Sequence, residues 1–337
     1  MKAVLLVGGE GTRLRPLTET IPKPLIPLVD RPFLGHVFDH LGRYGVEEVL
    51  LSSPYLEDVF AEFLARNTAG PTVKWIPEPT PLGTGGAVAN AARDLEETFI
   101  VLNGDILTDL DLSALVAHHR TTGATATITL SSVVDARPYG LVTLDEEGRV
   151  QEFTEKPTEA VPGLVNAGTY VLEPNAIHGV PRDRPVSIER EIFPGLIASG
   201  AMVQAFVSQD YWMDLGTPEK YLQATFDALD GKIGGLQYAA PHVDPRAEIS
   251  IRSHLGRWVV AGPGARIGAE SLVEDSVLLA GAVVQDRAKV TESILGPGAM
   301  IGADSIVQGA VLAEGASIPP GTSSEGARVG AGQVFGS

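Results

Sequence analysis

The sequence predicts an α/β protein, with a doubly wound, Rossmann-like domain over residues 1–231 and a left-handed parallel β-helix over residues 241–325. Two observations predict this arrangement. Up to about residue 230, short apolar runs alternate with amphipathic stretches, which is typical of βαβ units around a mostly parallel sheet. Beyond Gly231 the apolar residues recur every six positions, which is typical of stacked β-helix coils. Residues 326–337 are expected to form a frayed tail.

Apolar spacing predicts each element of the first half. The run 3–7 is a fully buried strand, and a helix begins at Pro32 and ends before Gly45 because its apolar residues recur at helical spacing. The apolar runs 141–144 and 150–153 flank Asp145-Glu146-Glu147-Gly148, which predicts a hairpin. The other expected strands are 46–52, 73–76, 99–102 and 126–133, and the other expected helices are 56–66, 87–95, 112–120 and 218–229.

The second half repeats in two phases. The first phase is Val243, Ile249, Leu255, Ala261, Ile267, Val273 and Leu279, and the second is Leu295, Ile301, Val307 and Ala313. A slip in register is therefore expected between Gln285 and Leu295.

Composition excludes several classes of function. The net charge of −17 repels a phosphate backbone, so nucleic acid is not an expected partner. The absence of cysteine removes disulfides, thiolate zinc sites and cysteine nucleophiles. No apolar run is long enough for a signal peptide or a membrane span, so we expect no membrane partner and a cytoplasmic location.

A glycine-rich string, Gly8-Gly9-Glu10-Gly11-Thr12-Arg13, directly follows the first strand. Glycines let backbone N–H groups approach a phosphate, and arginine adds positive charge. The string lacks the Gly-Lys-Ser/Thr of a P-loop and the third glycine of a dinucleotide fingerprint. Lys23 follows between two prolines and, without the glycine-rich loop, would be interpreted as a solvated surface lysine.

With Pro22-Lys23-Pro24-Leu25, this string resembles the signature of the sugar-1-phosphate nucleotidyltransferase family. The resemblance covers essentially residues 1–230. It continues in order with Pro81–Ala87, Asn103-Gly104-Asp105, Tyr139-Gly140, Glu155-Lys156-Pro157, Asn166-Ala167-Gly168 and Trp212–Gly216. The hexapeptide tail is also found in many members of that family.

The resemblance implies an enzyme that attacks the α-phosphorus of an NTP with a sugar 1-phosphate. Arg13 would then hold the triphosphate, and Lys23 would stabilise the charge that develops in the transition state. The resemblance also assigns catalytic roles to Asp105 and Asp214. The implied nucleotide-binding residues are Leu6, Gly8, Gly9, Gly11, Thr12, Arg13, Gly83, Thr84 and Gly104.

Asp105 and Asp214 are the expected ligands of Mg²⁺, which prefers oxygen and uses one or two protein carboxylates plus substrate phosphates. Asp105 follows a buried strand and should lie at the carboxyl edge of the sheet. Alternatively, Asn103-Gly104-Asp105 is a hairpin turn, and Asp214 is a helix N-cap, although Thr217 suits that position better.

The resemblance implies that Gly140, Glu155, Lys156 and Asn166 bind the sugar phosphate. Glu155-Lys156 is also consistent with an ordinary surface charge pair. The segments Pro81–Gly86, Ser187–Pro194 and Tyr211–Asp214 are most similar to those of mannose-1-phosphate guanylyltransferases. Thymidylyl and uridylyl relatives commonly have a glutamine near the second glycine loop, and no amide residue lies between Glu78 and Gly86. The expected substrates are therefore GTP and mannose 1-phosphate, with a thymidylyl- or uridylyltransferase as the alternative.

Two interpretations from other classes stay open. The β-helix half has only His242 and His254 as candidate bases for an acyltransferase. A regulatory subunit that had lost catalysis would usually lack one of Arg13, Lys23, Asp105 or Asp214, and all four are present. The β-helix is expected to serve homo-oligomer assembly through Val259, Val260, Leu278 and Leu279.

Overall fold

The structure is a computed structural model that describes residues 1–9, 11–53, 58–66, 70–78, 80–155, 157–181 and 184–336. The chain forms two compact units. The first comprises Met1–Gly8 and Val37–Trp212, and the second comprises Gly9–His36 and Met213–Ser337. From Gly9 onward, the glycine-rich segment after the first strand is therefore assigned to the same unit as the β-helix.

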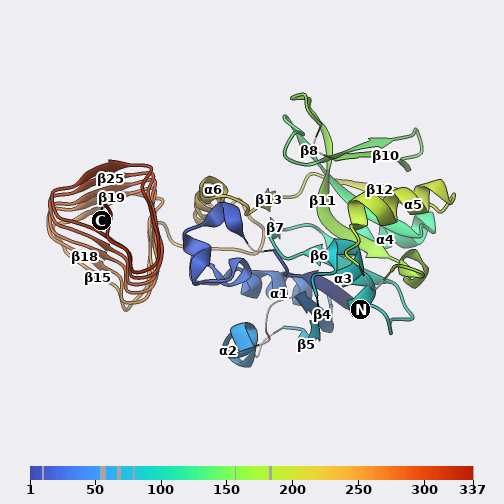
Figure 1. Cartoon of the computed structure of the whole chain (residues 1–337), viewed down its shortest axis with the longest axis horizontal. Coiled ribbons are helices and arrows are strands. Elements are labelled where there is room, and N and C mark those ends of the chain that lie inside the picture. The colour runs from blue at the N-terminus through green and yellow to red at the C-terminus, as the bar shows by residue number, and fades with distance from the viewer. Residues whose placement is uncertain are drawn as a thin grey trace. The chain divides into compact units, whose positions relative to one another are not determined.

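Within the described part of the first unit, a nine-stranded sheet forms the core. β1 (Lys2–Leu6) lies at its centre, with β6 (Phe99–Asn103) on one side, β4 (Glu48–Ser53) on the other and β5 (Thr72–Pro77) beyond β4, all parallel (Figure 1). β11 (Gly163–Leu172) runs antiparallel to β6, and continues the sheet to β9 (Gly140–Leu144), β10 (Val150–Glu155), β8 (Ala126–Val133) and β12 (Val203–Ser208). The doubly wound prediction is confirmed for the parallel half, with an antiparallel extension.

Helices connect the strands of this sheet. They are α1 (Phe33–Arg43), α2 (Asp58–Arg66), α3 (Gly83–Ala91), α4 (Leu112–Thr122) and α5 (Phe193–Ala198). Asp111 caps α4 by accepting a hydrogen bond from Ala114 N at 3.0 Å, and Gly123 ends it with a φ of 64°. α3 begins at Gly83, four residues before the expected start, because the glycines themselves form its first turn. The first two residues of the expected helix 56–66 lie outside the described residues.

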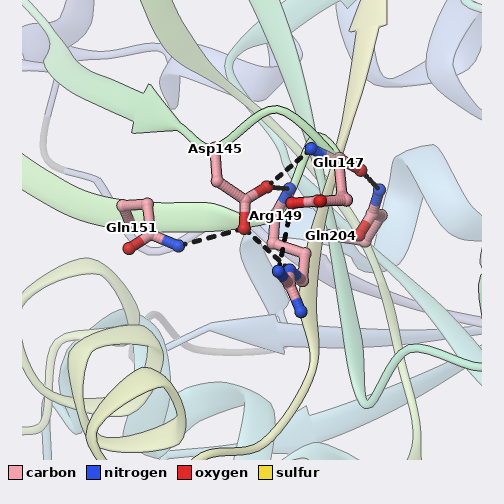
Figure 2. Close-up of polar contacts among 5 residues, drawn as sticks. All are labelled: Asp145, Glu147, Arg149, Gln151 and Gln204. Carbon is pink, nitrogen blue, oxygen red and sulfur yellow. Dashed lines mark hydrogen bonds and ion pairs between the residues drawn. The ribbon is translucent and has the colours of Figure 1, made fainter.

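The expected hairpin is confirmed as β9 and β10 (Figure 2). Asp145 organises its turn by accepting hydrogen bonds from Arg149 N at 2.8 Å and Glu147 N at 3.1 Å, and it pairs with the Arg149 guanidinium at 2.7 Å. Gln204 on β12 donates to Glu147 O at 2.9 Å, which ties the turn to the sheet. β11 and β12 were not predicted. β11 is hard to detect because Asn166 and Gly168 interrupt its apolar run at a β-bulge.

The second unit contains the hairpin of β2 (Pro27–Leu28) and β3 (Arg31–Pro32). α6 (Pro218–Leu229) follows Asp214, the last residue of β13 (Trp212–Asp214). Trp258 joins α6 to the β-helix, because its ring stacks on Phe226 with centroids 5.5 Å apart and its indole N–H donates to Asp230 at 3.0 Å.

Three parallel sheets form the β-helix. The β14 sheet contains β14 (His242–Val243), β17 (Val260–Ala261), β20 (Val277–Leu278), β23 (Ile294–Leu295), β26 (Val311–Leu312) and β29 (Arg328–Val329). The β15 sheet contains β15 (Glu248–Ile249), β18 (Arg266–Ile267), β21 (Val283–Val284), β24 (Met300–Ile301) and β27 (Ser317–Ile318). The β16 sheet contains β16 (His254–Leu255), β19 (Leu272–Glu274), β22 (Lys289–Thr291), β25 (Ile306–Gln308) and β28 (Ser323–Glu325). The predicted β-helix is confirmed, and the stacking is consistent with a left-handed one.

Successive coils differ from a strict six-residue repeat. Val260 pairs with Val277 and Val277 with Ile294, a spacing of 17 residues, and only the first coil is one residue longer. In the coils after the first, each corner holds a residue with positive φ. One corner contains Gly264, Gly281, Gly298 and Gly315, another contains Glu270, Arg287, Asp304 and Gly321, and the third contains Asp275, Glu292, Gly309 and Gly326.

The expected six-residue series is therefore wrong at two positions. Ala261 pairs with Leu278 rather than aligning with Leu279, and Leu295 pairs with Leu312 rather than aligning with Ala313. The third corner connects a strand of the β16 sheet to the next strand of the β14 sheet, and this connection is one residue shorter in every coil after the first. The slip expected between Gln285 and Leu295 is thus one member of a regular series.

Two further expectations about the β-helix are wrong. Residues 326–336 are not a frayed tail, since Val311 pairs with Arg328 and Ser317 forms a bridge with Val334. The four residues proposed for assembly, Val259, Val260, Leu278 and Leu279, are at most 3% exposed. They are buried within this chain, so they leave no apolar surface for a second subunit, and homo-oligomer formation stays a prediction without that support. No helix in the described ranges is long and apolar enough to cross a membrane.

Candidate active site

The sequence-predicted site residues fall in both units. Leu6, Gly8, Gly83, Thr84, Gly104, Asp105, Gly140, Glu155 and Asn166 belong to the first, and Gly9, Gly11, Thr12, Arg13, Lys23 and Asp214 belong to the second. Lys156 lies outside the described residues.

In the second unit the segment Gly11–Leu25 folds into short helical turns around Gly11. Gly11 has a φ of 61°, and a Cβ at this position would lie 3.0 Å from Thr18 Cγ2 and 3.1 Å from Lys23 Cβ. The Thr18 hydroxyl donates to Gly11 O at 2.9 Å. Glycine therefore permits both the left-handed turn and the close approach of Lys23. Lys23 begins the turn Lys23–Leu25, and its side chain is 8% exposed.

Asp214 gathers three cationic side chains among the described residues. Lys220 Nζ lies 3.2 Å from Oδ2, Arg13 Nη2 lies 4.0 Å from Oδ2, and Lys23 Nζ lies 3.9 Å from Oδ1. Only the Lys220 distance is short enough for a hydrogen bond. Oδ1 is buried and has no hydrogen-bond partner in the described part of the chain. A buried carboxylate oxygen without a partner is costly, and such an atom suits a bound cation.

The residues after Asp214 hold this cluster in place. A Cβ on Gly216 would lie 2.7 Å from Arg13 Nη2 and 2.9 Å from Asp214 Oδ1, so glycine makes room for both side chains. Thr217, not Asp214, caps α6 by accepting from Lys220 N at 3.3 Å, which excludes the capping alternative for Asp214. The buried Tyr221 hydroxyl donates to Pro27 O at 2.5 Å and fastens α6 to the β2–β3 hairpin.

In the first unit Asp105 lies at the carboxyl edge of the sheet. β1 and β6 are parallel neighbours, with Leu6 opposite Asn103, so Gly8 and Asp105 follow the carboxyl ends of adjacent strands. Gly104 N donates to Leu6 O at 2.7 Å. β6 pairs with β1 and β11 and not with the strand that follows Asp105, so the hairpin alternative is wrong. In open α/β sheets this edge is where ligands bind.

The second glycine loop is held by the segment around Val186. Gly85 N and Gly86 N donate to Val186 O at 2.8 and 3.2 Å. A Cβ on Gly83 would lie 2.7 Å from the same oxygen. The N–H groups of Gly85 and Gly86 are therefore engaged within the protein, and the expected ligand donors of this loop reduce to Gly83 and Thr84.

A cleft of about 530 Å³ joins this loop to the expected sugar site. Its lining includes Gly83, Thr84, Tyr139, Gly140 and Asn166, together with residues from Pro185 to Glu191. Candidates for nucleotide binding and for sugar binding thus share one cavity in this unit. Its volume is in the range of small-molecule sites.

Glu189 is a carboxylate in this cleft whose role was not predicted from the sequence. Its Oε2 accepts hydrogen bonds from Thr84 Oγ1 at 2.9 Å and from Ser187 Oγ at 2.8 Å. It lies in a π-helical turn, Ile188–Ile192, a conformation frequent at functional sites. The similarity of Ser187–Pro194 to guanylyltransferases was the available signal, but spacing alone does not reveal that Glu189 points toward Thr84.

Asn166 is oriented by its neighbours on β11. Its Nδ2 donates to the Tyr170 hydroxyl at 2.8 Å, and its Oδ1 accepts from Gly168 N at 3.0 Å. Burial raises the pKa of the Tyr170 phenol well above its usual range, with the nearby Glu189 carboxylate as the next cause. Tyr170 is therefore a neutral anchor that fixes Asn166 in the cleft. Glu155 is the last residue of β10, the strand paired with β9, which Gly140 begins.

Comparisons with known proteins agree with this arrangement. The family model described as nucleotidyl transferase matches residues 2–231, and the model described as GMPPB C-terminal domain matches residues 239–331. The chain is 40% identical over 296 residues to mannose-1-phosphate guanylyltransferase of Mycobacterium tuberculosis, covering 84% of this chain and 82% of that protein. It is 34% identical over 311 residues to the probable mannose-1-phosphate guanylyltransferase 3 of Oryza sativa subsp. japonica, covering 88% and 86%.

Among solved structures, the chain is similar to HddC from Yersinia pseudotuberculosis. The TM-score is 0.60 at 33% identity, covering 67% of this chain and 98% of HddC. A further structure of HddC, complexed with GMP-PN, gives the same values. HddC, a protein of this fold with related sequence, therefore binds GMP-PN.

Proposed function

The chain belongs to the nucleotidyl transferase family, and we propose that it transfers GMP from GTP to mannose 1-phosphate, giving GDP-mannose and pyrophosphate. The observation that carries this proposal is the similarity to mannose-1-phosphate guanylyltransferases over most of the chain, at 34 to 40% identity. The matched C-terminal domain supports it further. The relatives named above are guanylyltransferases, which favours this reaction over a thymidylyl- or uridylyltransferase.

In this reaction an oxygen of the sugar phosphate attacks the α-phosphorus of GTP. The bond from that phosphorus to the bridging oxygen of the β-phosphate breaks, and pyrophosphate leaves with the electron pair. The attacking oxygen is already ionised near neutral pH, so the protein needs no general base. It must instead neutralise two anions and hold them in line.

We propose that Arg13 and Lys23 provide this neutralisation. Arg13 is 63% exposed, so its guanidinium is accessible to a triphosphate, whereas Lys23 is held in the protein by the turn at Gly11. The family resemblance of Gly8, Gly9, Gly11 and Thr12 supports their contact with the phosphates. Leu6, Gly83, Thr84 and Gly104 would complete the nucleotide contacts.

Enzymes of this kind use a divalent metal, and we propose Mg²⁺ on Asp105 and Asp214. The buried Oδ1 of Asp214, which has no hydrogen-bond partner among the described residues, fits a hard cation, because oxygen ligands are what Mg²⁺ prefers. Bound Mg²⁺ would stabilise negative charge on the phosphates. The proposal that both carboxylates serve one cation rests on the family resemblance of their two motifs.

We propose that Gly140, Glu155, Lys156 and Asn166 bind mannose 1-phosphate. The orientation of Asn166 by Tyr170, and its place with Gly140 in the cleft, support this role for those two residues. Glu155 and Lys156 are assigned from the resemblance of their motif.

The test is pyrophosphate release with Mg²⁺, across GTP, ATP, UTP and dTTP, each paired with mannose, glucose, galactose and glucosamine 1-phosphates. We expect one strong signal, from GTP with mannose 1-phosphate. Turnover with another pair would retain the reaction and overturn the specificity. No turnover across the panel would favour a regulatory subunit. Asp105→Ala should abolish release in the same assay while the circular dichroism spectrum stays unchanged.

A further inference from the structure

One row of side chains on the β14 sheet is buried although it lies outside the core of the β-helix. Side chains alternate along a strand, and the second residue of each strand, such as Leu278 or Leu295, lies in that core. The first residues therefore point away from it. They are Val260, Val277, Ile294 and Val311, and each is at most 2% exposed. Their burial requires an element that covers this face of the sheet.

Contacts at the two ends of the row identify α6 as the covering element. Near the first coil, the ring of Trp258 stacks on Phe226 and its indole N–H donates to Asp230. At the other end, Arg328 of β29 replaces the apolar residue and lies 3.7 Å from Glu219. α6 rises about 16 Å between its two anchored ends, and the four strand steps from β17 to β29 cover about 19 Å. The length of α6 therefore matches the number of coils.

The terminal coil, residues 323–336, also contacts the segment that carries Arg13. Ala331 N donates to Glu19 Oε2 at 3.0 Å. Glu19 lies in a short helical turn, and the preceding residue, Thr18, donates its hydroxyl to the glycine that begins the turn of Arg13. Two successive hydrogen-bonded contacts therefore link the terminal coil to Arg13.

The residues of the preceding coil would not make these contacts. Val311 pairs with Arg328, so it holds the equivalent position one coil earlier, and a valine forms no ion pair with α6. Glu314 lies one repeat of 17 residues before Ala331. A glutamate in the place of Ala331 would bring a second carboxylate close to Glu19, and the two like charges would repel each other. The two contacts are therefore particular to the side chains of the terminal coil.

We propose that the terminal coil is a positioning element of the proposed active site. By holding Glu219 and Glu19, it fixes the first turn of α6, which follows Asp214, and the turn that carries Arg13. The β-helix thereby contributes to the binding of the triphosphate without touching it. This inference rests on the proposed role of Arg13 in holding the triphosphate.

The experiment measures the affinity of the full-length protein for GTP, with Mg²⁺ and without sugar phosphate, by isothermal titration calorimetry. It concentrates on Glu19, because an exposed ion pair such as that of Arg328 contributes little. Glu19→Ala removes the hydrogen-bond acceptor, Glu19→Gln keeps an acceptor oxygen, and the side chain is exposed, so neither change disturbs the core. Ala331→Glu introduces the residue that the preceding coil already accommodates. Its matched control is Ala280→Glu, because Ala280 is exposed and lies in the same row of an earlier coil. Arg13→Ala reports whether Arg13 holds the triphosphate.

A positioning role and a simple effect of charge predict opposite results for Glu19→Ala. Loss of a negative charge near the triphosphate would strengthen GTP binding, whereas loss of the contact that holds the turn should weaken it. We expect Glu19→Ala to weaken GTP binding about fivefold, and Glu19→Gln to recover most of that loss. Ala331→Glu should also weaken binding about fivefold, whereas Ala280→Glu stays within about twofold of the wild type.

The outcomes separate this inference from the proposal on which it rests. GTP binding by Glu19→Ala that equals or exceeds that of the wild type, with binding weakened in Arg13→Ala, would overturn the inference alone. Equal losses in Ala331→Glu and Ala280→Glu would assign the effect to the added charge and would also overturn it. Identical titrations of the wild type and Arg13→Ala would overturn the proposed role of Arg13, and the inference with it.

Discussion

Gly104 directly precedes the proposed metal ligand Asp105 and is closely packed against the end of β1. An added Cβ would lie 2.6 Å from Leu6 O and 2.7 Å from Val7 Cγ1, distances that real side chains do not tolerate. The obstacle is the backbone at the end of β1, which has no freedom to move aside. Gly104→Ala must therefore shift the turn that carries Asp105.

Two costs set the size of the effect on stability. Overpacking of a tight site costs about 1–3 kcal/mol. Lengthening the 2.7 Å hydrogen bond from Gly104 N to Leu6 O costs about 1 kcal/mol more. We expect the free energy of unfolding to fall by about 2–4 kcal/mol. Because a displacement near 1 Å in a reacting site costs about a hundredfold, turnover should fall by about that factor in protein that is still folded.

Urea unfolding and pyrophosphate release, measured on the same preparation, check both effects. Gly195→Ala is the matched control, because a Cβ on Gly195 meets nothing within 4 Å and the residue lies inside α5. That variant should keep its activity and gain up to about 1 kcal/mol from helix propensity. A Gly104→Ala protein with wild-type stability and turnover would refute the close packing and the placement of Asp105 that depends on it.

Three other predictions concern separate parts of the chain. Burial, followed by the nearby Arg43, lowers the pKa of His40 to about 4. As the pH falls, His40 is protonated in the unfolded chain before it is protonated in the folded chain. Its contribution to the free energy of unfolding is therefore fully present above pH 6.5 and is lost as the pH falls toward 4. The wild type should lose about 2 kcal/mol between pH 7.5 and pH 5 in urea unfolding, and His40→Gln should lack this component. Glu189→Ala should lower kcat/KM for both GTP and the sugar 1-phosphate by about 10- to 100-fold, because Glu189 binds Thr84 in a cleft that Asn166 also lines, and unchanged values for both substrates would contradict a role in the cleft. Asp275, with a φ of 47°, occupies a corner that Glu292 fills in the next coil and glycine fills in the two coils after that. Asp275→Gly should therefore raise the free energy of unfolding by up to about 1 kcal/mol, and a lowered melting temperature would argue against strain there.

The sequence predicted the parallel half of the sheet because burial on both faces leaves unbroken apolar runs. β1 and β6 are examples, with every residue from Phe99 to Leu102 buried. β11 was not predicted because its pairing changes register at a bulge around Asn166, where polar residues and glycine interrupt the apolar run. The β-helix repeat was detected, but its true spacing was not. A single residue is missing from one corner of each coil after the first, and a six-residue window does not measure the length of a whole coil.

For the candidate site, motifs predicted residue types better than they predicted interactions. Arg13, Lys23 and Asp214 were expected from their motifs, and the structure brings all three together in the second unit. Lys220 and Glu189 were missed because their importance depends on neighbours more distant than helical spacing. Glu189, for example, accepts a hydrogen bond from a residue 105 positions earlier in the chain. Only the folded chain reveals such a contact.

The constant 17-residue coil has a consequence for how this chain changes in length. Duplication of one whole coil, such as residues 277–293, would place Val277 and its copy in the same row and repeat every corner in its proper place. The β-helix would then lengthen by one strand spacing, about 4.8 Å, and the coils at its two ends would be unchanged. A deletion of six residues would instead rotate everything beyond it onto the wrong face. Insertions and deletions in this half of the protein should therefore preserve its structure only when they comprise whole coils. The six-residue pattern in the sequence reflects the three strands of each coil and is not itself the repeating unit.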